Sequence, residues 1–164
     1  MKHFRDLLPL ASLPGYFMWH FRQNKPFLCR LRNGLELSIR PHPSRDYDTV
    51  FEIFFAGIYA CEIARDKVQR IVDLGGNVGY SCLYWCLEYP EAEVITFEPH
   101  PLHCDLLQWH IDENMLSSRV RLFRAAAGTC EGKVNLSNAD TASSIISQDD
   151  GDSITVPLLD LFQT

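Results

Sequence analysis

The chain has 164 residues, which is the length of one domain rather than two. Its residues are 46% hydrophobic, 22% charged and 12% aromatic, a composition typical of globular proteins and unlike that of disordered chains. The formal net charge of −6 argues against a general nucleic-acid binder, because the chain has no basic excess to neutralise phosphates. We therefore expect a globular protein that acts on a small molecule and has no nucleic-acid partner.

The sequence predicts neither a membrane span nor a secretory signal. No segment has the run of about 18 apolar residues that a membrane span requires. Lys2, Arg5 and Asp6 near the start are followed by no long apolar core, which argues against a secretory signal. None of the six cysteines forms a C-x-x-C pair, and unpaired thiols are typical of reducing compartments. These features predict a cytoplasmic protein with no integral membrane segment and no metal site.

Residues 1–68 are predicted to form a lead-in to the main domain. Residues 2–13 have the composition of a short N-terminal helix that ends before a Pro-Gly pair. From about Tyr47 to Lys67, apolar residues recur at helical spacing, which predicts one long helix.

A β-hairpin is predicted within this lead-in. Two alternating segments, residues 27–32 and 35–40, flank the pair Asn33-Gly34. An Asn-Gly pair is typical of a two-residue type I′ turn, in which both central residues need a positive φ. A Pro-His-Pro-Ser stretch then separates the hairpin from the long helix.

The sequence pattern changes at residue 69. From there to residue 164 it predicts short apolar strands that alternate with amphipathic helices. In chain order the predicted elements are a strand at 70–74, a helix at 80–89, a strand at 93–97, a helix at 101–114 and a strand at 119–124. This alternation predicts a doubly wound, mostly parallel, Rossmann-like α/β sheet. Further along, residues 133–136 and 154–159 predict short extended pieces on either side of a polar loop.

A glycine-rich loop follows the first strand of this domain. It begins after Asp73 and contains Gly75, Asn77 and Gly79. A strand that leads through glycines into a helix N-terminus is typical of nucleotide sites, because the backbone can approach the ligand closely. The spacing fits neither a P-loop nor the G-x-G-x-x-G dinucleotide fingerprint. Asn77 stands where a middle glycine would, and asparagine tolerates a positive φ.

A second acid, Glu98, ends the next strand. Because the carboxyl ends of successive parallel strands line one crevice, we expect Glu98 to lie near Asp73. A carboxylate there can accept both hydroxyls of a ribose, while Asp73 can order the loop and face a cationic ligand group. Structural roles stay open at this point: Asp73 as a helix-capping acid, the glycines as a tight turn, and Glu98 as a solvent-facing residue before a proline turn.

The two motifs together resemble the FkbM family of S-adenosylmethionine-dependent methyltransferases. The run from Ile71 to Ser81 matches the family's D-x-G-A-N-x-G loop, and Phe97 to Pro101 matches its E-P-x-P second strand. Residues 121–128 resemble its third strand, residues 156–161 its later V-x-x-L-D-x-L, and residues 46–54 its lead-in helix. The resemblance touches most of the chain beyond residue 46.

The resemblance implies a class I methyltransferase fold, S-adenosyl-L-methionine as cofactor, and methyl transfer to a hydroxyl oxygen of a sugar or other small natural product. It places the methionine part of the cofactor near the loop and the ribose near Glu98. The cofactor-binding residues that it implies are Asp73, Gly75, Gly76, Asn77, Gly79 and Glu98. It assigns no catalytic base, and His100, His103 and His110 are predicted to be polar helix residues rather than bases.

The length of the chain bears on this assignment. The FkbM family carries a D-x-E-G element on its next strand, and no such sequence occurs before Thr164, so the sheet is expected to be incomplete. An open apolar strand edge invites a partner chain or self-association. Three hypotheses remain: a truncated or split methyltransferase, a non-catalytic methyltransferase-like binding module, and a nucleotide-dependent oxidoreductase, which the missing dinucleotide fingerprint disfavours.

Overall fold

A computed structural model describes the chain over residues 26–31, 34–137, 145–146 and 153–163. The chain divides into two compact units, Met1–Ile63 and Ala64–Thr164. The helix predicted at residues 2–13 lies outside the described residues. That residues 1–68 serve as a lead-in to a methyltransferase domain at 69–164 stays a prediction.

The first unit contains the predicted hairpin. Strands β1 (Phe27–Arg30) and β2 (Glu36–Ile39) pair antiparallel, with Phe27 opposite Ile39 and Arg30 opposite Glu36. The Arg30 and Glu36 side chains form an ion pair across the strands. The alternation of apolar and polar residues therefore predicted these two strands and their partnership correctly.

The turn of the hairpin differs from the two-residue turn that we expected. The N–H of Leu31 donates to the carbonyl of Leu35 (2.8 Å), and the N–H of Gly34 donates to the carbonyl of Leu31 (3.0 Å). Three residues thus separate Leu31 from Leu35, and Gly34, with φ of +93°, occupies the left-handed position that three-residue hairpin loops require. Asn33 itself lies outside the described residues.

The prediction of one long helix from Tyr47 to Lys67 is wrong. Helix α2 spans Asp46–Phe51 and continues through one π-helical turn, Glu52–Ala56. Gly57 then adopts a φ of +68°, and its N–H donates to the carbonyl of Glu52, which is a common way for a helix to end. The apolar spacing continues past Gly57, but no α-helix follows. Ile58 and Ile63 in that segment are each 56% exposed.

The second unit is built on a three-stranded parallel sheet. Strands β3 (Arg70–Leu74), β4 (Glu93–Phe97) and β5 (Val120–Phe123) lie in that order, with β3 at one edge among the described strands. Helices α3 (Tyr80–Glu88) and α4 (Pro101–Glu113) connect them. The strand and helix positions agree with the prediction to within one residue at each end, and the α/β class and the parallel order are confirmed. The doubly wound, Rossmann-like arrangement stays a prediction.

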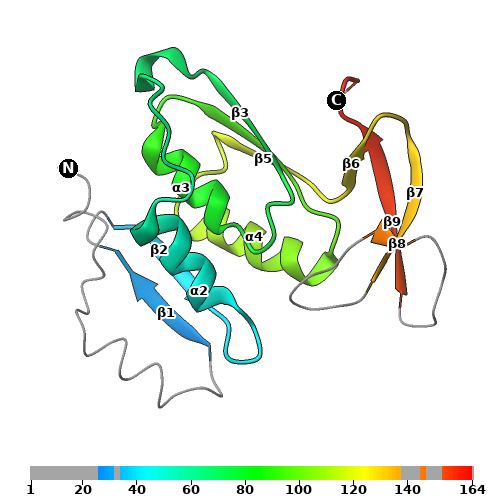
Figure 1. The fold of residues 1–164 in the computed structure, drawn as a ribbon, viewed down its shortest axis with the longest axis horizontal. Coiled ribbons are helices and arrows are strands. Elements are labelled where there is room, and N and C mark those ends of the chain that lie inside the picture. Colours follow the sequence, from blue (N-terminus) through cyan, green and yellow to red (C-terminus); the bar gives the residue numbers. More distant parts are fainter. Residues whose placement is uncertain (1–25, 32–33, 138–144, 147–152, 164) are drawn as a thin grey trace. The chain divides into compact units, whose positions relative to one another are not determined.

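Both connecting helices lie on one side of this sheet, as Figure 1 shows. Side chains alternate along a strand, so Asp73 of β3 and its neighbours Val94 and Thr96 of β4 point to the helix-covered face. Val94 and Thr96 are completely buried there. Val72 and Leu74 of β3 point to the opposite face.

A separate four-stranded mixed sheet follows in the chain. Its order is β6 (Ala126–Gly128), β9 (Ser153–Asp160), β7 (Gly132–Ser137) and β8 (Ile145–Ile146). Strands β7 and β9 contain the two predicted extended pieces. Strand β6 was not expected, because three small residues carry little strand signal by themselves. It forms because it pairs with β9, where a Cβ on Gly128 would lie 2.7 Å from the side chain of Leu158.

Within the described residues, no helix is both long enough and apolar enough to cross a membrane. The same part of the chain brings no group of three or more His, Cys, Asp or Glu side chains into an arrangement that could hold a metal ion.

Candidate functional site

The loop after β3 contains three left-handed residues in alternation. Gly75 has φ of +80°, Asn77 of +48° and Gly79 of +102°. Asn77 thus adopts the positive φ that its residue type tolerates, as the sequence predicted. The N–H groups of Gly75 and Gly76 both donate to the carbonyl of Phe97 (2.9 and 3.0 Å), which ties the loop to the end of β4.

The glycines of the loop do not all serve the same purpose. A Cβ on Gly76 would overlap the hydroxyl of Thr96 and lie 3.0 Å from a methyl of Leu107, and a Cβ on Gly79 would lie 3.1 Å from Leu107. These two glycines let the loop pack against β4 and α4. Gly75 has nothing within 4 Å of the place where a Cβ would stand. Only at Gly75, therefore, does the missing side chain leave space open beside the loop.

Glu98 joins the two loops that follow β3 and β4. Its Oε2 accepts the N–H of Asn77 and its Oε1 accepts the N–H of His100, both at 2.8 Å. Glu98 is only 5% exposed, so the interpretation as a solvent-facing residue does not hold. Each carboxylate oxygen has two lone pairs, and these two bonds leave acceptor capacity on both oxygens.

Asp73 lies behind the loop, against α3. Its Oδ2 accepts the hydroxyl of Ser81 (2.9 Å) and lies 3.4 Å from the hydroxyl of Thr96. Burial raises the pKa of Asp73 above its usual value, hydrogen bonds from Ser81, Thr96 and Trp85 act in the opposite direction, and the nearby Glu98 raises the pKa further. These contacts fit the structural interpretation of Asp73, as an acid that fixes the first turn of α3 beside the loop.

Asn77 carries a buried acceptor. Within the part of the chain that the structure describes, its Oδ1 has no hydrogen-bond partner, while its main-chain N–H is bound by Glu98. A buried carbonyl oxygen without a donor is costly, and such atoms call for an explanation in terms of water, an ion or a ligand. Asn77 is therefore the member of the predicted set with the clearest unused binding capacity.

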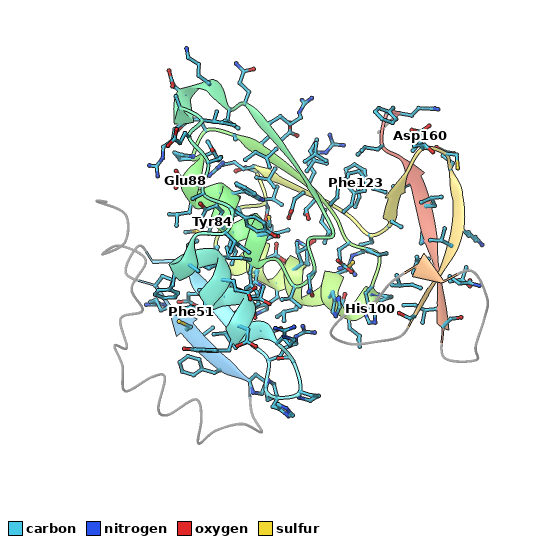
Figure 2. The ribbon with its side chains drawn as sticks, in the orientation of Figure 1. Phe51, Tyr84, Glu88, His100, Phe123 and Asp160 are labelled. Carbon is cyan, nitrogen blue, oxygen red and sulfur yellow. The ribbon has the colours of Figure 1, made fainter. Side chains whose placement is uncertain are left out.

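Three histidines of α4 and its cap are buried, which we did not predict from the sequence, and that they do not act as bases stays a prediction. His100, His103 and His110 are 2%, 3% and 1% exposed. Figure 2 shows His100 beside the start of α4, where it is the residue that precedes the helix. The Nδ1 of His110 lies 2.7 Å from the carbonyl of Val78, so α4 also contacts the glycine loop. Their spacing of three and seven residues places them on one helix face, a signal that the sequence contained.

The structure therefore brings Asn77 and Glu98 into direct contact and places Gly75 and Gly79 at the two ends of the same loop. Asp73 and Gly76 lie underneath and support the loop from β3 and β4. Acidic and amide oxygens dominate this arrangement, which suits a ligand with hydroxyl or ammonium donors.

Comparison with known proteins adds a partial sequence likeness. No family model matches the chain. Over 66 residues, or 40% of this chain, it is 33% identical to methyltransferase sdnD of Sordaria araneosa. That stretch is 26% of the length of the relative, so the chain is similar to about a quarter of that methyltransferase.

Solved structures show weaker likenesses, each over part of the chain. The chain is similar to a methyltransferase FkbM from Methylobacillus flagellatus, with a TM-score of 0.46 and 13% identity, over 70% of this chain and 26% of that one. It is also similar to P. horikoshii TYW2 in complex with MeSAdo, with a TM-score of 0.43 and 18% identity, over 63% of this chain and 37% of that one.

Proposed function

We propose that this chain binds S-adenosyl-L-methionine at the loop Gly75–Gly79 and at Glu98. We further propose that it takes part in methyl transfer to a hydroxyl oxygen of a sugar or other small acceptor, as a member of the FkbM family. The observation that carries the proposal is the buried carboxylate of Glu98, bound to the N–H of Asn77 across the ends of two neighbouring parallel strands. The partial identity with a named methyltransferase supports the same activity.

The residues present fit such a cofactor. The buried Oδ1 of Asn77 is an acceptor in need of a donor, which the α-ammonium of a methionine group would supply. The space beside Gly75 allows a ligand to approach the backbone. Glu98 keeps acceptor capacity for a ribose hydroxyl beyond its two main-chain partners.

The chemistry follows from what each part contributes. When bound, S-adenosyl-L-methionine supplies an activated methyl group together with its leaving group. The residues of the loop and Glu98 would then bind the cofactor and orient its methyl group. Positioning is the main task of a protein in a displacement reaction between two bound reactants. We propose no base for the acceptor hydroxyl.

A binding module without activity of its own is the second candidate. The observation that favours it is that both site carboxylates already accept donors from the protein: Asp73 from Ser81, and Glu98 from Asn77 and His100. Such a module would bind the cofactor and transfer nothing.

Titration calorimetry with S-adenosyl-L-methionine and S-adenosyl-L-homocysteine tests the proposal. We expect both to bind the wild-type chain, and Glu98→Gln to weaken binding at least tenfold, because hydrogen bonds to a charged group contribute more than those to a neutral one. Glu93→Gln is a matched control, since Glu93 begins the strand that Glu98 follows and its carboxylate pairs with Arg70 at the far end. Absence of binding at millimolar ligand would refute the proposal.

A transfer assay separates the two candidates. Incubation of the chain with methyl-labelled cofactor and a set of hydroxyl acceptors, sugars included, would show label in a product if the chain is a methyltransferase. Binding without label transfer to any of them would favour the binding module.

A further inference from the structure

Besides the main-chain N–H groups of Asn77 and His100, a side chain in the first turn of α4 also contacts the carboxylate of Glu98. The Nδ1 of His103, the third residue of the helix, lies 3.5 Å from Oε1 of Glu98. Both side chains are buried, at 3% and 5% exposed, so water screens this contact little. Sequence patterns did not link these two residues, and the role of Glu98 in the proposed function does not by itself involve a histidine.

Neighbouring residues fix the position of the His103 ring. The ring of His100 stacks on it, with 4.3 Å between the ring centroids and 27° between the planes. The main-chain N–H of His100 donates to the same Oε1 of Glu98. The thiol of Cys104 donates to the main-chain carbonyl of Glu98 (2.9 Å). The start of α4 thus restrains both the backbone and the side chain of Glu98.

The number of acceptor positions on the Glu98 carboxylate determines how a contact from His103 affects ligand binding. A carboxylate offers about four acceptor positions, two on each oxygen. The N–H of Asn77 uses one on Oε2, the N–H of His100 uses one on Oε1, and His103 faces the other position on Oε1. As far as the described residues show, one position, on Oε2, is left for a ligand.

We propose that His103 is a positioning residue that engages Oε1 through its Nδ1–H and thereby makes Glu98 present Oε2 alone to a ligand hydroxyl. This inference rests on the proposed function, because it concerns the same cofactor site. It differs from the sequence-based expectation that the carboxylate of Glu98 accepts both ribose hydroxyls.

The first experiment needs no ligand. Two-bond ¹H–¹⁵N spectra of the wild-type chain report which ring nitrogen of each histidine carries hydrogen. We expect His103 to carry hydrogen on Nδ1, because only then can it donate to Oε1. A ring with hydrogen on Nε2 alone would turn a bare lone pair toward the carboxylate and would overturn the proposal, whether or not the chain binds a cofactor.

The second experiment is a double-mutant cycle on S-adenosyl-L-homocysteine affinity. We expect His103→Leu to weaken binding roughly tenfold. His103→Asn should restore most of it, because the asparagine Nδ2 stands at the same bond distance from Cβ as the histidine Nδ1. In a Glu98→Gln background, His103→Leu should have little further effect, because the group that His103 positions is already changed.

His110→Leu is the control for a purely structural effect. His110 is equally buried on the same helix and contacts Val78 rather than Glu98, so its variant should weaken binding by the same factor in both backgrounds. The same additive behaviour for His103→Leu would overturn the positioning role. If the wild-type chain binds neither cofactor form, the proposed function fails, while the spectra still decide whether His103 engages Glu98.

Discussion

The two faces of the β3–β4–β5 sheet carry side chains of opposite character. On the helix-covered face, β3 directs the carboxylate of Asp73 toward α3, next to the fully buried Thr96. On the opposite face, the aliphatic side chains of Val72 and Leu74 on the same strand are 48% and 56% exposed. On the same face, at the last residues of β4 and β5, Phe97 and Phe123 stack with 4.9 Å between their ring centroids.

This difference shows what each face does. Burial of a carboxylate is costly unless hydrogen bonds compensate it, and Asp73 has the hydroxyl of Ser81 at 2.9 Å. The helix-covered face therefore contributes to the site, because its polar contacts hold the glycine loop and the start of α3. On the opposite face, β3 carries the aliphatic side chains of Val72 and Leu74 and, at its first residue, the exposed ion pair between Arg70 and Glu93, away from the glycine loop. Three sets of variants test this contrast.

The largest effect is expected where the loop packs on the helix-covered face. Gly76→Ala would force a methyl group against the hydroxyl of Thr96 and should lower the free energy of unfolding by about 1–3 kcal/mol, measured by urea denaturation. Adding Thr96→Ala should recover a large part of the loss, because it removes the atom in the way.

Gly75→Ala is the matched control in the same loop. A Cβ there meets nothing within 4 Å, but its φ of +80° is unfavourable for alanine, so this variant should lose stability through the backbone alone. Thr96→Ala should not rescue it. Equal rescue of both variants would contradict the steric explanation for Gly76.

A second comparison places the same substitution on each face. Val94→Thr puts a hydroxyl at a fully buried position under the helices and should cost about 1–3 kcal/mol of unfolding free energy. Val72→Thr puts it on the opposite face at a half-exposed position and should change stability by about 0.5 kcal/mol or less. An equal cost at the two positions would mean that another copy of the chain or a partner covers the opposite face in solution.

The smallest effect concerns the charge of Asp73. Because the pKa of Asp73 in the folded chain is raised above its usual 3.8, the folded state binds more protons than the unfolded state between these two values. The contribution of Asp73 to stability should therefore fall as the pH rises through that interval. Asp73→Asn removes this dependence, so the stability of the variant relative to wild type should increase over the same pH range.

Urea denaturation at a series of pH values measures this change. Asp66→Asn, at an exposed side chain, shows how much the loss of any carboxylate alters the profile. A wild-type chain that gains stability relative to Asp73→Asn as the pH rises would show that the hydrogen bonds to Asp73 outweigh its burial.

Local steric rules explain what could be predicted well. The positive φ of Asn77 and the first-turn position of Pro101 in α4 both follow from what those residue types permit. Apolar spacing, by contrast, predicted too long a helix after Tyr47, because the spacing continues past Gly57, where the left-handed backbone ends the helix. In the hairpin, the Asn-Gly pair indicated the right place for the turn and the wrong number of residues in it.

The sequence by itself determined the order of strands and helices in the second unit and the conformation of the loop after β3, because both depend on neighbouring residues along the chain. Tertiary structure alone decided the roles of the acids. Asp73 bonds to Ser81 and Thr96, and Glu98 bonds to Asn77 and His100 beside His103. Two of these contacts, Asp73 with Thr96 and Glu98 with Asn77, join residues 23 and 21 positions apart, and only the pairing of β3 with β4 brings them together.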